Sequence, residues 1–279
     1  MNRIWILMLF CFTYLVSSCS SENEAIEISN ENPETSNGPS FDLLATPVGD
    51  VDFPTSCNAE AGPLVERGVA LMHNMMYPEA KLVFSMADDI DPNCAMSYWG
   101  QAMVMIHPLW GDALSAEDYE RGLALTRRGQ SIEGITEREQ NFLRTTEAFY
   151  LASEDLNMMN GFGKMSAVWQ DISTKMPEDM DAKAFNSLFK VAISKNDPER
   201  LEAGGVALDV LKVMPDHPGG HHYVIHAYDT AGLAIDALEA HLNEQNTNEI
   251  LQQADLVIDR TDNSAARYLI NDTCHALKK

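Results

Sequence analysis

The densest group of reactive side chains in this sequence is a histidine-rich segment. Four of the eight histidines fall within ten residues, at His217, His221, His222 and His226. Histidine is the commonest metal ligand, and its ordinary pKa lies close to neutral pH. The Pro-Gly-Gly break at 218–220 is typical of the entry to a helix. The segment therefore predicts a helix that carries either a metal or ligand site, or the polar lining of a groove.

Two of these histidines have the spacing of a metal chelate. His222 and His226 stand four residues apart, so both rings can bind one divalent ion, such as zinc, from one helix face. Asp229 is seven residues from His222, roughly 10 Å along a helix axis, which is too far for the same ion. We expect His217 or a carboxylate of a neighbouring repeat as the third ligand. The structural alternative is that His222 and Tyr223 pack between helices while His217 caps the helix.

Common catalytic motifs are missing from the sequence. It contains no HExxH, no Cys-x2-Cys pair, no Gly-x-Ser-x-Gly and no Gly-rich phosphate loop. The formal net charge of −23 argues against nucleic acid as a partner, because such a surface repels phosphates. An enzyme would therefore have to rely on His, Asp and Glu side chains.

The elements that must position these residues are predicted to be helices. Apolar residues recur at helical spacing, and no segment alternates convincingly with a period of two. Helix starts are marked by an approximate capping box at 115–118, a full one at 136–139, and Pro198 at a first helical position. These signals predict an all-α fold. In the middle of the chain we expect helices over 116–130, 136–152, 161–176 and 180–195.

The helices are predicted to pair into repeats. A tetratricopeptide unit has about 34 residues, with small residues where its two helices meet and a proline after the second. Setting Gly68 in the glycine position of such a unit places six further residues in matching positions, namely Leu64, Leu71, Ala80, Phe84, Ala87 and Pro92. We therefore expect a right-handed superhelix of stacked helix-turn-helix hairpins, preceded by a disordered tether.

Two blocks resemble a family of bacterial tetratricopeptide-repeat proteins of undefined function. The first is DPNCAMSYWG at 91–100, followed by HPLWG at 107–111. The second is the histidine-rich segment, in which the matching residues are His217, Pro218, Gly219, His222, Tyr223, Ile225, His226, Tyr228 and Asp229. The resemblance covers roughly residues 47–240 and is lost beyond them.

The repeat frame, together with this resemblance, implies a binding groove. Six side chains are expected on its concave face, namely His73, Trp99, His107, His222, His226 and Asp229. Such side chains can bind a peptide, an organic ligand or a cation. The first hypothesis is a non-catalytic scaffold that binds a peptide, protein or small ligand in this groove. The alternative is a metal-dependent or acid–base enzyme centred on the helix over 217–229.

The N-terminal residues predict export and lipid attachment. Residues 1–18 combine Arg3 with an apolar run of signal-peptide length, and Val16–Cys19 resembles a bacterial lipobox. We expect a lipid on Cys19 that holds the protein on a membrane, followed by a flexible tether over 19–54. This predicts an outer-membrane lipoprotein of the bacterial cell envelope, facing the periplasm or the cell surface.

Three cysteines remain beyond Cys19, and export implies an oxidising compartment. Cys57 and Cys94 lie about one repeat apart and form the candidate disulfide pair, which leaves Cys274 over. Residues 55–240 are then expected to form the repeat domain, with 241–279 as a terminal cap or a partly disordered tail.

Overall fold

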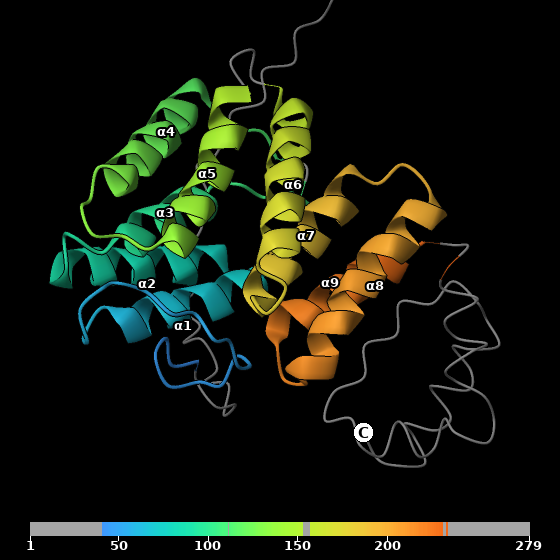
Figure 1. Ribbon diagram of the computed structural model, residues 1–279, viewed down its shortest axis with the longest axis horizontal. Helices are drawn as coiled ribbons and strands as arrows, with labels where there is room; N and C mark the ends of the chain where they lie inside the picture. Colours follow the sequence, from blue (N-terminus) through green and yellow to red (C-terminus); the bar gives the residue numbers. More distant parts are fainter. Residues whose placement is uncertain (1–40, 111, 153–156, 231–232, 234–279) are drawn as a thin grey trace, which may run out of the picture. The chain divides into compact units, whose positions relative to one another are not determined.

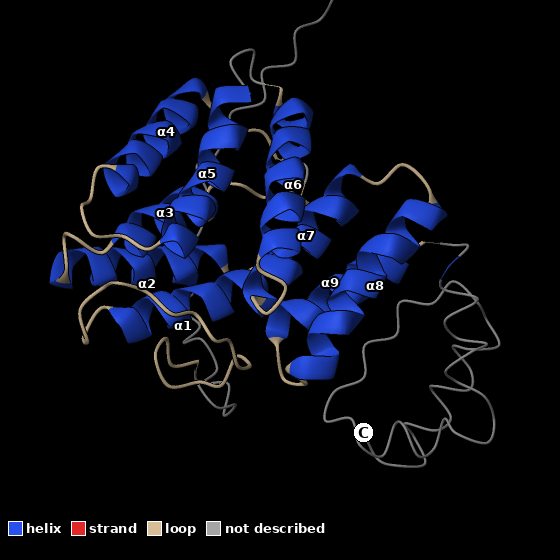
Figure 2. Ribbon diagram, in the orientation of Figure 1, coloured by secondary structure: helices blue, strands red, loops and turns tan. Residues whose placement is uncertain are grey.

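The computed structural model describes residues 41–110, 112–152, 157–230 and 233, and every regular element in them is helical (Figures 1 and 2). The helices are α1 (Gly62–His73), α2 (Tyr77–Ile90), α3 (Ala95–Met103), α4 (Ala116–Gln130), α5 (Glu137–Ala152), α6 (Met158–Lys175), α7 (Met180–Ile193), α8 (Asp197–Val213) and α9 (Pro218–Tyr228). The four helices expected in the middle of the chain correspond to α4–α7, with ends that differ by at most three residues. The right-handed superhelix stays a prediction.

Polar side chains set the starts of these helices. Ser115 accepts a hydrogen bond from the backbone N–H of Asp118, whose carboxylate accepts from the N–H of Ser115, so α4 begins with a complete capping box. Asp179 and Asn196 cap α7 and α8 in the same manner, through backbone N–H groups three residues further on. These bonds satisfy donors that a helix start leaves unpaired.

Small residues let the first three helices approach closely. The Phe84 ring of α2 lies against Gly68 of α1 and Gly100 of α3. A Cβ atom added at Gly68 would lie 2.7 Å from that ring, and one at Gly100 would lie 2.3 Å from it. The aromatic side chain therefore fills the space that the two glycines leave open.

Helix α9 joins distant parts of the chain. It packs against α8, its neighbour in sequence, and also against α7 and α1 (Figure 1). The contact between α1 and α9 brings together side chains 150 residues apart, as in the hydrogen bond between His73 and Tyr223. The candidate site lies at this junction.

The residues before α1 form a strap, here defined as residues 41–58. Phe53 is buried and stacks on Trp99, with ring centroids 5.5 Å apart. The backbone N–H of Asp50 donates to the carbonyl of Asp216, and the side chain of Asn74 donates to the carbonyl of Val48. The strap, which was expected to belong to the flexible tether as far as residue 54, contacts the helices from Leu43 onward, where Arg67 of α1 donates to the Leu43 carbonyl.

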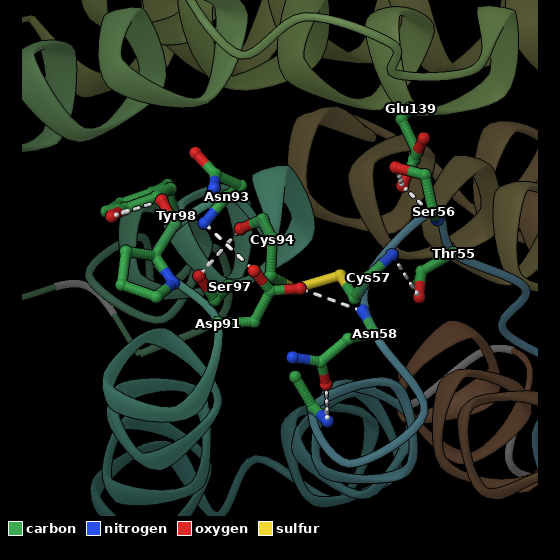
Figure 3. Close-up of a disulfide and its surroundings, with 12 residues drawn as sticks. Thr55, Ser56, Cys57, Asn58, Asp91, Asn93, Cys94, Ser97, Tyr98 and Glu139 are labelled. Carbon is green, nitrogen blue, oxygen red and sulfur yellow. Dashed lines mark hydrogen bonds between the residues drawn. A yellow bond between two sulfur atoms is a disulfide. The ribbon is translucent and has the colours of Figure 1, made fainter.

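A disulfide holds the end of the strap. Cys57 and Cys94, the candidate pair, are joined by an S–S bond of 2.03 Å (Figure 3). Cys94 is the residue directly before the first residue of α3. On either side of it, the backbone N–H of Asn58 donates to Asp91, and Ser56 donates to the buried carboxylate of Glu139 through both its N–H and its hydroxyl. Closing a loop of 37 residues contributes about 4 kcal/mol in the chain-entropy model.

A single methyl group is expected to disrupt the packing of α2 between α1 and α3. Gly100→Ala would place its Cβ inside the contact radius of the Phe84 ring, and overpacking of this kind costs about 1–3 kcal/mol. Urea unfolding of the full chain, followed by circular dichroism, measures the loss.

Gly163→Ala is the matched control for this substitution. Gly163 is also helical, in α6, but no atom lies within 4 Å of its added Cβ. We expect it to stabilise the protein by about 0.4–1 kcal/mol, because alanine restricts the unfolded chain. Equal effects of the two substitutions would contradict the packing described for Phe84.

Candidate functional site

Four buried side chains from three helices form one hydrogen-bonded network. His73 ends α1, Asp181 lies in the first turn of α7, His217 precedes α9, and Tyr223 lies within α9. The carboxylate oxygen Oδ1 of Asp181 lies 3.2 Å from His73 Nε2 and 3.3 Å from His217 Nε2. His73 Nδ1 lies 2.8 Å from the hydroxyl of Tyr223. We call these four residues the buried network.

The N-cap of α9 fixes where the protons of the network lie. The backbone N–H of Gly220 donates to His217 Nδ1 over 3.1 Å, so this nitrogen carries no proton. A neutral His217 is therefore protonated on Nε2 and donates to Asp181. His73 Nε2 donates to the same carboxylate oxygen, which leaves His73 Nδ1 to accept from the Tyr223 hydroxyl. The proposed cap role of His217 is thus confirmed.

The electrostatics of the network agree with this proton pattern. Burial lowers the pKa of His73 to about 4, although a hydrogen bond to Asp181 opposes the shift, so the ring stays neutral. Burial alone would raise the pKa of Asp181, but hydrogen bonds from His217 and His73 outweigh it and lower that pKa to about 2. Burial raises the pKa of Tyr223 well above its usual range. The network therefore holds one negative charge on Asp181.

The network itself is a poor metal site. Ligand atoms of His73, Asp181 and His217 lie within 4.8 Å of one another, which is close enough to surround one ion. However, a histidine bound through Nε2 needs its proton on Nδ1, and the Gly220 N–H already occupies Nδ1 of His217. Binding of a metal to His217 Nε2 would therefore break the hydrogen bond from Gly220 that caps the start of α9.

The His222–His226 pair has the geometry of a chelate. The two Nε2 atoms lie 3.1 Å apart, and the rings stack with centroids 4.9 Å apart. His222 Nδ1 donates to the carbonyl of His73 over 2.9 Å, so its neutral ring keeps a lone pair on Nε2. Burial lowers the pKa of His222, against the effect of this hydrogen bond, which favours the neutral form that a metal or a substrate proton requires.

The other predicted site residues have different surroundings, although the main-chain carbonyl of His73 bonds to His222. His217 points to Asp181, so it is not the third ligand beside His222 and His226. Trp99 and His73 are fully buried in the core and line no open groove. His107 bonds to Asp112 and stacks on Tyr77, with Trp110 beside both rings. Asp229 is exposed at the end of α9.

Sequence reasoning missed the roles of Asp181 and Tyr223. Tyr223 stands inside the histidine-rich segment but was expected only to pack between helices, whereas its hydroxyl also holds His73. Asp181 is one of many acidic residues near helix starts, and Asp179 supplies the actual cap of α7. The signal available for Asp181 was its position two residues after the cap, in the first turn of a helix with an apolar face.

The stability of the protein is expected to fall as the pH is lowered from about 6.5 toward 4. In the unfolded chain His73 takes up a proton near its ordinary pKa of 6.5, whereas in the folded protein burial delays protonation until about pH 4. The unfolded state therefore binds more protons in this window, so acid favours unfolding. Urea unfolding at several pH values between about 7 and 4 measures the slope.

His73→Gln is expected to show a shallower dependence on pH in this window than the wild type. His221→Gln is the control, because His221 lies in α9 with an exposed side chain. Identical slopes for the wild type and His73→Gln would rule out His73 as the titrating group.

Comparison with known proteins identifies one family and two curated relatives that resemble parts of the chain. The ThiF family matches residues 230–279, of which only 230 and 233 are described. A curated protein of Culex quinquefasciatus, adenylyltransferase and sulfurtransferase MOCS3, is 37% identical over 76 aligned residues, covering 21% of this chain and 17% of the relative. Its namesake from Anopheles gambiae is 43% identical over 47 residues, covering 17% of this chain and 11% of that protein. The chain thus spans less than a fifth of either relative. No solved structure matches it.

These similarities correct the identification made from sequence. The family that matches is ThiF and the relatives are insect adenylyltransferases, not bacterial tetratricopeptide lipoproteins, so the predicted family and cell-envelope location are wrong. The predicted non-catalytic scaffold, with a peptide in its groove and a membrane partner, is contradicted by the same findings. The leader over 1–18, the lipid site Cys19 and the tail over 241–279 lie outside the described residues. Among the residues that are described, no helix is long and apolar enough to cross a membrane.

Proposed function

We propose that the chain is an enzyme whose reactive centre is the His222–His226 pair, with a divalent transition metal held between the two Nε2 atoms. The observation that carries the proposal is the pairing of a 3.1 Å Nε2–Nε2 separation with the hydrogen bond from His222 Nδ1 to a backbone carbonyl. In metal sites, a ligating histidine almost always donates its second ring N–H in this way.

The separation of the two nitrogens suits adjacent ligands of one ion. Two zinc–nitrogen bonds of about 2.0–2.1 Å at a tetrahedral angle place their nitrogens about 3.3 Å apart. In the metal-free protein the same short distance is explained by a hydrogen bond from His226 Nε2–H to the lone pair of His222. An ion would take the place of that proton, His226 would then carry its proton on Nδ1, and the rings would need little movement.

The composition of the site favours zinc or a similar ion over magnesium or calcium. Imidazole nitrogens suit zinc, copper and nickel, whereas magnesium and calcium prefer oxygen ligands. No third His, Cys, Asp or Glu ligand atom reaches the pair in the described part of the chain. In this proposal, water and substrate complete the coordination, as a Lewis-acid centre requires.

Metal analysis of protein purified without a histidine tag tests the proposal. We expect about one bound zinc per chain by plasma mass spectrometry after dialysis against zinc, and a thermal midpoint that falls when a chelator removes the ion. His222→Ala combined with His226→Ala should abolish both results, since no other pair of this geometry remains on α9.

His221→Ala is the control for this experiment. His221 lies on the same helix, but its Nε2 bonds to the carbonyl of Pro215 and its side chain is exposed. It should leave the bound zinc unchanged. Zinc bound equally by the wild type and the double variant would exclude the pair as the metal site.

A second candidate function is adenylyl transfer, favoured by the similarity of residues 230–279 to the ThiF family and by the similarity of part of the chain to insect adenylyltransferases. An adenylyltransferase moves AMP from ATP to an acceptor and releases pyrophosphate. A site for that chemistry would be separate from the histidine pair, because magnesium-bound phosphates prefer oxygen ligands. The ThiF match lies in the C-terminal segment. The chain covers less than a fifth of the length of either relative.

Titration of the full chain with ATP and magnesium tests this second function. Saturable binding heat with ATP, and none with inorganic triphosphate, is the expected result if the segment recognises a nucleotide. The double His222→Ala and His226→Ala variant should bind ATP like the wild type, which separates the two functions. Lack of saturation at millimolar ATP would contradict nucleotide binding by this chain.

A further inference from the structure

The orientation of His222 depends on one carbonyl group. Its Nδ1 bonds to the carbonyl of His73, and a carbonyl cannot donate, so the proton must lie on Nδ1. If this carbonyl moved, either ring nitrogen of His222 would be free to carry the proton. The carbonyl of His73, at the end of α1, therefore determines that the Nε2 atom of His222 presents a lone pair to His226.

The end of α1 offers this carbonyl because the helix closes with a Schellman motif. The N–H of Met76 donates to the carbonyl of Leu71, and the N–H of Met75 donates to that of Met72. Met75 has a φ of 57°, the left-handed conformation that this motif requires and that glycine usually supplies. The carbonyl of His73 has no helical partner and accepts from His222 instead.

The side chain of the same residue is held from three sides. His73 Nε2 donates to Asp181, its Nδ1 accepts from Tyr223, and its ring stacks on Phe185 with centroids 4.4 Å apart. His73 is wholly buried, so water cannot replace a lost partner without opening the core. The position of the His73 backbone is therefore determined by the buried network.

Two consecutive residues of α9 bond to this one histidine. Tyr223 bonds to its side chain and His222 bonds to its main-chain carbonyl. On the other side of the network, Asp181 uses Oδ1 for both histidines, while its buried Oδ2 has no hydrogen-bond partner. The buried charge thus depends on two donors, and loss of either disturbs the contact between α1 and α9.

We infer that Tyr223 and Asp181 are positioning residues, which act through His73 to hold His222 in its Nδ1–H tautomer with the Nε2 lone pair directed at His226. This inference rests on the proposed function of the pair, because it names the residues that prepare that centre. Neither Tyr223 nor Asp181 touches the metal. Outer partners of this kind typically change metal affinity by about 10–100-fold.

Nitrogen NMR of the histidine rings in the metal-free full chain tests the tautomer directly. We expect His222 of the wild type to carry its proton almost wholly on Nδ1. Tyr223→Phe removes only a hydroxyl, and Asp181→Asn removes the buried charge. Both should populate the Nε2–H tautomer of His222 and weaken zinc binding about 10-fold or more.

Thr126→Val is the matched control. Thr126 is buried and its hydroxyl bonds to the carbonyl of Gly122 and to Thr146, so the variant loses a buried hydrogen bond between α4 and α5. It should lower stability without changing the His222 tautomer or the zinc affinity. A merely structural role for Tyr223 would make its variant behave like this control.

The outcomes separate this inference from the proposed function. An unchanged His222 tautomer in Tyr223→Phe, or an equal change in Thr126→Val, would overturn the positioning role. If the tautomer responds as expected and the wild type binds no zinc, the positioning role stands and the metal-dependent function fails.

Discussion

The ionised carboxylate of Asp181 is the point at which α1, α7 and α9 are held together. A buried charge costs several kcal/mol unless donors surround it, and here the rings of His73 and His217 supply them. Since these donors come from helices far apart in sequence, the charge can be buried only when all three helices are in place. Removing one partner of such a buried group typically costs about 3–5 kcal/mol. The fold of this region and the orientation of the histidine pair therefore share one cause.

The strap acts at the same junction from the outside. Its residue Asp50 bonds to Asp216, directly before the cap of α9, and its carbonyl at Val48 accepts from Asn74, directly after α1. Gly49 has a φ of 88°, and a side chain there would collide with Asp216 and Pro218. The disulfide then fixes the far end of the strap at the start of α3. A segment with little regular structure thus joins α1 and α9, two of the three helices that the buried network holds together.

The ThiF family match and the histidine pair concern different parts of the chain. The ThiF family matches residues 230–279, while the pair, the network and the strap lie before residue 230. Helix α9 ends at Tyr228, close to the start of the ThiF match. The structure of the helices before this point supports the metal site, whereas the residues after it are known here through their similarity to the ThiF family. For this reason the metal-dependent and nucleotide-dependent functions are tested by separate ligands.

Local sequence signals determined the helices and their starts, because capping boxes, N-terminal prolines and apolar periodicity act over a few residues. The i, i+4 spacing of His222 and His226 likewise placed both rings on one face before any tertiary contact was known. Only the tertiary structure decided that His217 turns away from that pair and toward Asp181, and that His73 and Trp99 are buried. It also decided the tautomer of His222, which depends on a carbonyl 149 residues away. Proton positions in such a network follow from partners brought together by folding, and no local pattern records them.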